Sequence, residues 1–454
     1  MELKKEFEDI IAGMPGLEAD DMLRAIRELP PVVSVRVNTG KGASVPNGSD
    51  AVPWCPEGFY LPERRQFTFD PFFHGGRYYV QDASSMFIFH VLRQLCTRPV
   101  RYLDLCAAPG GKTTAALSAL PADSLIVANE IVPQRARVLA DNVMRWGQAN
   151  CIVTGNAPRD LGRLNGYFDV IAADVPCSGE GMFRKEPEAV AQWSPALVAE
   201  CAERQRSIVA DIWPALRPGG LFIYSTCTFN RQENEEMILH IMKTYGAEPV
   251  AVPTSPEWHI HGAIGADLPC YRFLPHLVRG EGLFMCALRK PDSGERTAFS
   301  PRKTKAQAEP VPKEVKQWLC GDFTYQAAGD SIIAVPAPLA THTDYLRGLL
   351  RALSAGIQVA EKKGKGYIPT HSLALARELN RSEFSTFEAD YRTAIAYLRG
   401  EAINVSADRG YVLITHRGAP LGFANNLGNR ANNLYPKPLR IISNNTPATA
   451  PAVL

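Results

Sequence analysis

Two cysteines in this chain each follow directly on an apolar run. Cys177 stands in Asp174-Val-Pro-Cys-Ser-Gly-Glu-Gly, and Cys227 stands in Tyr224-Ser-Thr-Cys-Thr. A thiolate is a strong nucleophile toward a flat, electron-poor ring, and a nearby carboxyl group such as Asp174 can hold that ring in its reactive form. Taken together, these residues indicate covalent chemistry on such a ring.

Cytosine is a ring that requires this combination. Its carbon 5 becomes nucleophilic only when a thiolate adds to carbon 6 while nitrogen 3 is protonated or hydrogen-bonded. After transfer of a methyl group, the proton on carbon 5 must leave and the enzyme thiol must be eliminated, which gives the second cysteine a role as general base or release group. Chemistry alone does not tell the two thiols apart, and either one taken singly is more often a buried structural cysteine.

A cofactor loop precedes both thiols. The segment Asp104-Leu-Cys-Ala-Ala-Pro-Gly-Gly-Lys-Thr predicts a strand, a glycine turn and the start of a helix, which is typical of nucleotide-like cofactor sites. Cys106 occupies the place of the first P-loop glycine, and no Gly-x-Gly-x-x-Gly follows, so ATP hydrolysis and dinucleotide binding are disfavoured. S-adenosylmethionine over Cys106–Lys112, with Glu130 accepting hydrogen bonds from its ribose, fits the layout. The alternative is a plain turn beside a solvated carboxylate.

Strands and helices alternate from residue 100 to residue 290. This alternation predicts a mostly parallel sheet with helices on both faces, an α/β fold in which ligands bind at the carboxyl edge. The loop, Glu130 and both thiols follow strands and are therefore expected at one edge. The predicted strands begin at Val100, Ser124, Cys151, Phe168 and Gly220, and the predicted helices span 113–120, 133–146, 195–216 and 231–245.

The remaining segments suggest further domains, as expected for 454 residues with 46% hydrophobic content. Residues 1–95 form an N-terminal lead-in with a half-buried strand at Val32-Val-Ser-Val-Arg-Val-Asn and a helix capped by Asp82 or Ser84. Residues 96–290 form the catalytic domain. Residues 291–312 have little apolar content and predict a linker. After the linker we expect an α/β region at 313–395, a module at 396–442 with a hairpin near Gly410, and a tail at 443–454.

Composition excludes some classes and leaves others open. The chain has no run of about 18 apolar residues and a charged start, so we expect neither a membrane span nor a secretory signal, and a cytoplasmic location. The spacing of its ten cysteines matches neither a metal site nor a disulfide framework, so we expect no bound metal. The net charge of +2 requires any nucleic-acid surface to be local. Short basic clusters begin at Arg302, Lys362 and Lys437 and could meet RNA phosphates if they share a face, although solvated surface charge is the favoured explanation of each one taken separately.

These motifs together resemble the Sun/Fmu-type RNA cytosine-5 methyltransferases, and within them the bacterial RsmF-like 16S rRNA methyltransferases. The resemblance is strong from about 75 to 290, and residues 396–440 are similar to the PUA-like module of this subgroup. It implies a Rossmann-like class I S-adenosylmethionine-dependent fold with an N-terminal α+β region. The markers are Gln81-Asp-Ala-Ser-Ser, the loop from Asp104, Asn129-Glu130 with Arg135, the two cysteine motifs, Arg272-Phe-Leu-Pro-His and Gly280-Glu-Gly-Leu-Phe.

The resemblance also implies roles for single residues. Cys227 would be the nucleophile, Cys177 would assist product release, and Asp174 would support the base at nitrogen 3. Asn156 stands where the family often has aspartate, so it would contact adenine without a charge. The implied cofactor site comprises Cys106, Ala107, Ala108, Pro109, Gly110, Gly111, Lys112, Glu130, Arg135, Asn156 and Asp174.

The implied substrate is RNA, most directly 16S rRNA in the 30S subunit, and the protein would act as a monomer without a metal. A flipped cytosine would enter a pocket near Phe183 or Trp193, with Trp193 favoured as a core residue. Three alternatives stay open: methylation of transfer RNA, methylation of a protein or small molecule, and a ribosome-assembly factor whose catalysis is secondary. Loss or retention of activity in Cys227→Ala separates a thiol mechanism from the others.

Overall fold

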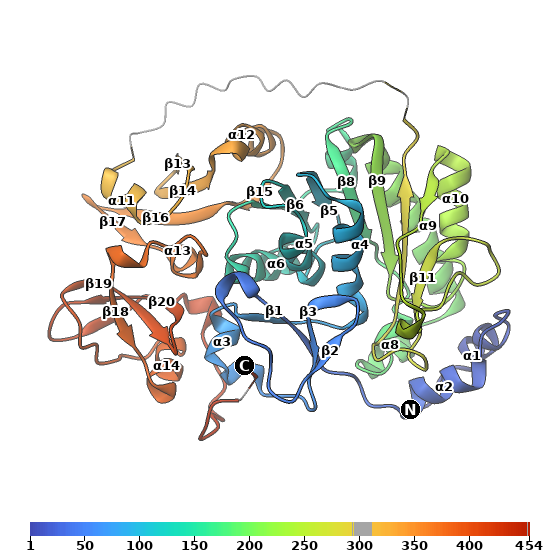
Figure 1. The fold of residues 1–454 in the computed structure, drawn as a ribbon, viewed down its shortest axis with the longest axis horizontal. Helices are drawn as coiled ribbons and strands as arrows, with labels where there is room; N and C mark the ends of the chain where they lie inside the picture. Colours follow the sequence, from blue (N-terminus) through green and yellow to red (C-terminus); the bar gives the residue numbers. More distant parts are fainter. Residues whose placement is uncertain (293, 295–310, 452) are drawn as a thin grey trace.

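A nine-stranded sheet forms the centre of the protein in the computed structural model, which describes residues 1–292, 294, 311–451 and 453–454 (Figure 1). Its strand order is β10-β12-β9-β8-β5-β6-β7-β15, and β11 pairs with β12 beside this order. Strands β5 to β9 are parallel to one another, and the other four join in antiparallel pairings. The strands are β5 (Arg101–Asp104), β6 (Leu125–Asn129), β7 (Cys151–Thr154), β8 (Phe168–Asp174), β9 (Leu216–Thr226), β10 (Glu248–Val250), β11 (Cys270–Phe273), β12 (Leu283–Arg289) and β15 (Ala352–Ala355).

Helices cover both faces of this sheet, as the alternating pattern predicts. Side chains of a strand point alternately to its two faces, so Tyr102 packs in the cluster that contains α4, α5 and α6, whereas Leu103 packs in the cluster that contains α9 and α10. The parallel strands are apolar on both sides for this reason. The arrangement is the expected Rossmann-like α/β fold. The helices are α4 (Phe87–Leu95), α5 (Gly111–Ala119), α6 (Pro133–Trp146), α7 (Pro158–Gly162), α8 (Pro187–Gln192), α9 (Pro195–Ile212) and α10 (Glu235–Tyr245).

Two of the predicted helix boundaries are wrong. The helix predicted to reach residue 216 ends at Ile212, and a 3₁₀ turn with Pro214 follows it, because proline cannot donate the backbone hydrogen bond that a continuing helix needs. The helix predicted from residue 231 begins at Glu235, since the preceding residues form a hydrogen-bonded turn in the site.

The predicted cap of the helix at the end of the N-terminal region is also displaced. Asp82 Oδ2 accepts a hydrogen bond from the Ser85 N–H at 3.2 Å and so caps a short 3₁₀ turn ahead of α4.

An antiparallel sheet of the N-terminal region packs against the central domain. Its order is β2 (Asp50–Val52), β3 (Cys55–Tyr60), β1 (Ser34–Val37) and β4 (Tyr78–Val80). The sequence predicts a half-buried β1, but all four of its residues are buried. Arg36 explains the difference, because its guanidinium donates to Gln81 Oε1 at 2.9 Å and to Thr114 Oγ1 at 2.6 Å on α5. A pattern of alternating polarity here marks a domain contact rather than a solvent face.

The first two helices pack near α8, at the edge of the molecule opposite the C-terminal region (Figure 1). These are α1 (Lys5–Ala12) and α2 (Ala19–Glu28). The ring centroid of Phe7 lies 5.1 Å from that of Phe183 and 5.5 Å from that of Trp193, in edge-to-face geometry. Both partner rings are fully buried. Trp193 is thus a core residue as favoured, and Phe183 packs in the same core.

The C-terminal region contains two further four-stranded sheets. The first has the order β13 (Phe323–Ala328), β14 (Ser331–Pro336), β16 (Ile357–Lys363) and β17 (Gly366–Pro369). The second has the order β18 (Ser385–Glu388), β19 (Gly410–His416), β20 (Ala419–Asn426) and β21 (Ala431–Asn433). Its β19–β20 pair is antiparallel, which confirms the hairpin predicted near Gly410. The helices of this region are α11 (Lys313–Gln317), α12 (Ala340–Leu349), α13 (His371–Leu375) and α14 (Tyr391–Leu398).

One C-terminal strand belongs to the central sheet. β15 pairs with β7 in antiparallel register, Ala355 opposite Ile152 and Ala352 opposite Thr154. The sequence gives no sign of this pairing, and it brings residues near 351 to the carboxyl end of β7. Most of the predicted linker at 291–312, including the basic cluster at Arg302, lies outside the described residues. The predicted domain limits stay predictions.

Candidate active site

The two thiols lie at neighbouring strand ends and touch. Strands β8 and β9 are parallel and in register, with Asp174 opposite Ser225, so Cys177 and Cys227 leave the sheet side by side. Their Sγ atoms are 3.3 Å apart, and both residues are partly exposed. The hydrogen bond with Cys227 and then burial raise the pKa of the Cys177 thiol well above its ordinary value. Cys177 is therefore a thiol, not a thiolate, at neutral pH.

Asp174 is fixed beside the thiols by two partners. Lys112 Nζ donates to Asp174 Oδ2 at 2.8 Å, and Ser225 Oγ donates to Oδ1 at 2.7 Å. Burial by itself lowers the pKa of Lys112, but the Asp174 carboxylate outweighs burial and the net shift is upward. Each carboxylate oxygen keeps a further acceptor position, so Asp174 can still bind a ring N–H. The structure thus brings Lys112 of the cofactor loop to the thiol site.

The cofactor loop follows β5 and is braced by its neighbours. Gly110 has φ 111°, and a Cβ there would lie 3.2 Å from Leu139 Cδ1, so this turn requires glycine. Arg135 donates to the carbonyl oxygen of Ala108 at 2.9 Å, and Asn142 donates to that of Pro109 at 2.8 Å. Arg135, which is predicted to bind the cofactor, thus contacts the backbone of the loop itself.

Glu130 presents a carboxylate at the end of β6. Its Oε1 accepts from the Val132 N–H at 2.9 Å, and its Oε2 lies 3.4 Å from Arg135. The next two residues, Ile131 and Val132, are exposed by 57% and 40% although they are apolar. A fixed carboxylate followed by open aliphatic surface fits the ribose and adenine of S-adenosylmethionine, and the glycines of the loop leave room for close approach to the backbone.

The side chain of Asn156, which is predicted to contact adenine, already makes one hydrogen bond within the protein. Its Oδ1 accepts a hydrogen bond at 3.0 Å from the backbone N–H of Arg351, the residue before β15. Its backbone is held by Asn129, whose Oδ1 accepts from the Asn156 N–H at 2.9 Å. The Asn156 side-chain N–H₂ and one lone pair of Oδ1 remain to contact a ligand, and the bond from Arg351 shows that the C-terminal region takes part in shaping this end of the site.

A buried polar network beneath the thiols was missed by the sequence interpretation. Glu233 carboxylate oxygens accept from the Ser178 N–H at 3.1 Å and from Gln205 Nε2 at 2.7 Å. Glu180 Oε2 accepts from the Phe229 N–H at 2.6 Å, and Asn230 Nδ2 bonds to both glutamates. The two cysteine loops are thus tied together from below. The polar run Asn230-Arg-Gln-Glu-Asn, which begins three residues after Cys227, was the available signal, since a buried strand is rarely followed by so many hydrogen-bonding side chains.

Asp104, at the end of β5, is a second missed residue. It is buried, and its Oδ2 accepts from Thr113 Oγ1 at 2.6 Å beneath the cofactor loop. Burial raises the pKa of this carboxyl group to about 7. Asp104 is assigned no role from the sequence, although an acidic residue at the end of an apolar strand already indicates a carboxyl group with a shifted pKa.

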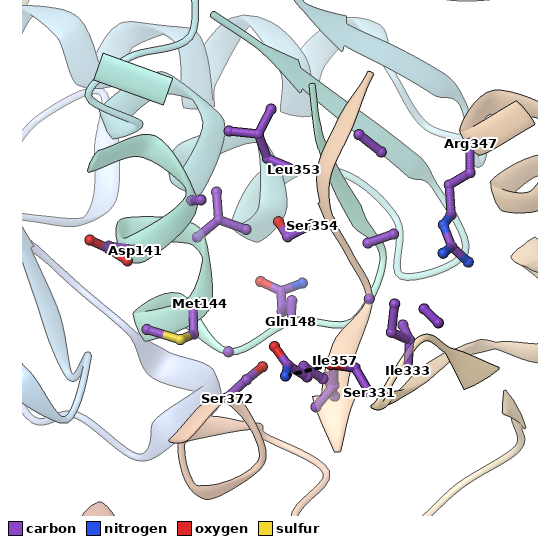
Figure 2. Close-up of a pocket in the computed structure, with 18 residues that line it drawn as sticks. Asp141, Met144, Gln148, Ser331, Ile333, Arg347, Leu353, Ser354, Ile357 and Ser372 are labelled. Carbon is purple, nitrogen blue, oxygen red and sulfur yellow. Dashed lines mark hydrogen bonds between the residues drawn. The ribbon is translucent and has the colours of Figure 1, made fainter. Parts of the chain in front are cut away.

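A further cavity lies away from the thiols. It has a volume of about 360 Å³ and lies between α6 and the C-terminal strands β14, β15 and β16. Figure 2 shows Met144 and Gln148 on one side of it and Ile333 and Arg347 on the other. It contains neither thiol nor any residue of the cofactor loop. Within the described ranges no cluster of three or more His, Cys, Asp or Glu side chains could hold a metal, and no described helix is long and apolar enough to cross a membrane.

Comparison with known proteins agrees with this geometry. Residues 97–289 match the family described as 16S rRNA methyltransferase RsmB/F. A ribosomal RNA small subunit methyltransferase F from Cronobacter sakazakii is 33% identical over 471 residues, covering 96% of each chain. The chain belongs to this methyltransferase family. Residues 3–83 match the N-terminal domain of 16S rRNA methyltransferase RsmF, and residues 384–441 match the methyltransferase RsmF PUA domain.

Other relatives support the same assignment. The methyltransferase F of Escherichia coli O9:H4 is 34% identical over 467 residues, covering 94% of each chain. A methyltransferase homolog from Pyrococcus horikoshii has 27% identity and a TM-score of 0.53, covering 63% of this chain and 95% of its own. The P. horikoshii protein NSun6, solved with the S-adenosylmethionine analogue SFG, shares the fold at 20% identity and a TM-score of 0.53, over 63% of this chain and 98% of its own. S-adenosylmethionine is the cofactor of this chain, and the PUA-like C-terminal module is confirmed.

Proposed function

We propose that this methyltransferase methylates carbon 5 of a cytosine in 16S rRNA through a covalent adduct with Cys227. The observation that carries the proposal is the pair of thiols 3.3 Å apart beside Asp174. Carbon 5 of cytosine needs a thiolate for carbon 6 and a polar partner for nitrogen 3, and a nitrogen or oxygen target would need no thiol at all. S-adenosylmethionine supplies the methyl group as an electrophile.

The resemblance to the family supports Cys227 as the attacking sulfur, with the Cys177 thiol beside it at 3.3 Å. In the addition step the Cys227 thiolate forms a bond to carbon 6, and the electron pair of the carbon 5–carbon 6 double bond moves to carbon 5. Nitrogen 3 takes up a proton from solvent in this step, and Asp174, held by Lys112 and Ser225, accepts the hydrogen bond of the resulting N–H; this proton returns to solvent when the double bond is restored. Carbon 5 would then bond to the methyl carbon while the bond from that carbon to the cofactor sulfur breaks, with its electron pair left on sulfur and S-adenosylhomocysteine as the leaving group.

Cys177 becomes a suitable base once the adduct exists. The contact that most raises its pKa is the one with Cys227, and that contact is weakened when the Cys227 sulfur is bonded to carbon. Cys177 can then lose its proton to solvent and take the proton from carbon 5. The electron pair of that C–H bond restores the double bond, the bond from sulfur to carbon 6 breaks, and Cys227 leaves as a thiolate.

A substitution experiment tests this division of roles. Cys227→Ala is expected to abolish formation of 5-methylcytosine, and Cys177→Ala is expected to accumulate a covalent protein–RNA adduct, seen as a slow band on a denaturing gel. Cys320→Ala is the control, since Cys320 is exposed and distant in sequence from both loops. Retained methylation in Cys227→Ala, or an adduct that accumulates in Cys227→Ala instead of Cys177→Ala, contradicts the proposal.

The substrate and setting complete the proposal. The family and its named relatives support small-subunit rRNA, and we propose that the protein acts as a cytoplasmic monomer on 16S rRNA or the 30S subunit, without a metal. Labelled methyl transfer to unmodified transfer RNA, naked 16S rRNA and 30S subunits, followed by nucleoside mass spectrometry, separates the alternatives. Product in transfer RNA alone would preserve the chemistry and overturn the substrate.

A further inference from the structure

Four cationic side chains surround a small cavity away from the thiols. Lys41, Arg77, Arg377 and Arg381 line a space of about 150 Å³, and its other lining residues are glycines, alanines, a leucine and a proline. Lys41 and Arg77 come from the N-terminal sheet region, and the two other arginines follow α13 in the C-terminal region. No acidic residue lines the cavity. Two regions of the chain thus bring like charges together at their junction.

The hydrogen bonds that these four cationic side chains donate go to neutral acceptors. Lys41, Arg77 and Arg381 donate to main-chain carbonyl oxygens, and Arg377 donates to Asn38 Oδ1 at 2.6 Å. Throughout the described ranges, no carboxylate oxygen lies within 4.0 Å of any of these four cationic groups. The Arg377 Nε is buried without any partner. Glu378 attracts Lys41 and Arg377, and Glu57 attracts Arg377, but neither carboxylate lines the cavity. Two carboxylates compensate four cations only in part, and incomplete compensation in a partly buried place is costly, which favours binding of an anion.

Glycines hold the cluster tightly together. A Cβ at Gly40 would lie 2.4 Å from the Arg377 guanidinium, and a Cβ at Gly147 would lie 2.8 Å from Lys41 Cε. Burial, and after it the charges of Arg377, Arg77 and Arg381, lower the pKa of Lys41 well below its ordinary value. The backbone therefore accommodates cations whose mutual repulsion a bound anion would relieve.

We propose that this cluster binds one backbone phosphate of the RNA substrate. The arginine guanidinium is planar and pairs with phosphate oxygens through two parallel hydrogen bonds. A cavity of about 150 Å³ admits a phosphate group but not a whole nucleotide, and Arg381 is exposed at its outer side. The inference rests on the proposed RNA substrate and names a contact that the thiol site does not include.

The cluster lies well away from the target base. Helix α6 begins three residues after Glu130 of the cofactor site and ends at Trp146, beside Gly147 of the cluster. Fourteen residues of α-helix span about 20 Å. The bound phosphate therefore belongs to a nucleotide distant from the methylated one. Such a contact fixes the orientation of the RNA without reading its sequence.

The test uses neutral replacements of the two less constrained arginines. We would prepare Arg77→Gln with Arg381→Gln, the single variant Arg381→Gln, and Arg392→Gln as a matched control, because Arg392 is an exposed arginine of α14 away from the cavity. The affinity for unmodified 16S rRNA is measured across a series of KCl concentrations. We expect weaker binding by the double variant, with the slope of log K against log salt reduced by about 1 for each lost phosphate contact. The KM for RNA should rise while kcat is unchanged.

Further readings separate the inference from its alternatives. Affinity and salt slope equal to those of Arg392→Gln in both cavity variants would overturn it. Inorganic phosphate that raises the Tm of the wild type but not of the variants, with unchanged RNA affinity, would show a small-anion site and also overturn it. The single variant keeps the test valid if the double variant does not fold, since Arg381 donates only to the carbonyl oxygen of Gly418. Failure of the wild type to form 5-methylcytosine would instead refute the proposed function.

Discussion

Ser225→Ala tests whether the orientation of Asp174 contributes to catalysis. Ser225 Oγ donates to Asp174 Oδ1 at 2.7 Å, and the residue is buried at the end of β9. A hydrogen bond to a charged group contributes about 1.5–3 kcal/mol. The lower figure applies here, because Lys112 still holds the other carboxylate oxygen and the Asp174 side chain is 33% exposed. A loss of about 1.4 kcal/mol from transition-state stabilisation corresponds to a roughly tenfold lower kcat.

Steady-state methyl transfer at saturating RNA measures this effect. The KM for S-adenosylmethionine should change less than kcat, because Ser225 lies outside the loop from Cys106 to Lys112 and Lys112 still holds Asp174 in the variant. The split between kcat and KM distinguishes positioning from cofactor binding. Ser207→Ala, at an exposed position on α9, is the control. A folded Ser225→Ala protein with kcat within twofold of the control would refute the reasoning.

Two further predictions concern stability. Asp104→Asn should stabilise the protein relative to wild type more at pH 8 than at pH 5. The raised pKa of about 7 in the folded state means that the folded form holds its proton while the unfolded form has lost it, so this contribution to stability falls between about pH 4 and pH 7, by roughly 2–3 kcal/mol from pH 5 upward. Urea unfolding at both pH values measures it, and an equal effect at both would contradict the assignment. Glu233→Leu should cost about 3 kcal/mol, because it leaves the Ser178 N–H and Gln205 without their buried acceptor. A melting curve within a degree or two of wild type would show that the network under the cysteine loops is not structural.

The sequence was sufficient to predict those parts of the fold that local sequence patterns determine. The alternation of strands and helices predicted the parallel sheet, and the glycine turn after Asp104 predicted the loop. Helix ends were less accurate where side chains compete with the backbone. The turn from Asn230 to Asn234 replaces the first turn of a predicted helix, because its side chains bind Glu180, Glu233 and backbone groups of the cysteine loops.

Local sequence patterns could not predict the contacts between segments that lie far apart in the sequence. The alternating strand around Arg36 predicts a solvent face, yet the buried guanidinium bonds to Gln81 and Thr114. Asn156 is predicted to contact adenine, and only the pairing of β15 with β7 shows that its Oδ1 also accepts a hydrogen bond from Arg351. Periodicity reports which face of a segment is buried, but it does not report what covers that face.

The proximity of the two thiols follows from sheet register rather than from either cysteine motif. Asp174 and Ser225 are paired residues of adjacent parallel strands, and adjacent strands lie about 4.8 Å apart. Cys177 lies three residues beyond Asp174, whereas Cys227 lies two residues beyond Ser225. The loop that carries Cys177 therefore uses one residue more than the loop that carries Cys227 before the two sulfur atoms meet. The Gly181 N–H supplies part of the constraint by donating to the Cys227 carbonyl oxygen at 2.8 Å, and a Cβ at Gly181 would lie at that same distance from this oxygen. The glycine after Glu180 is thus required for the approach of the two loops, and the sulfur contact depends on it as much as on the cysteines.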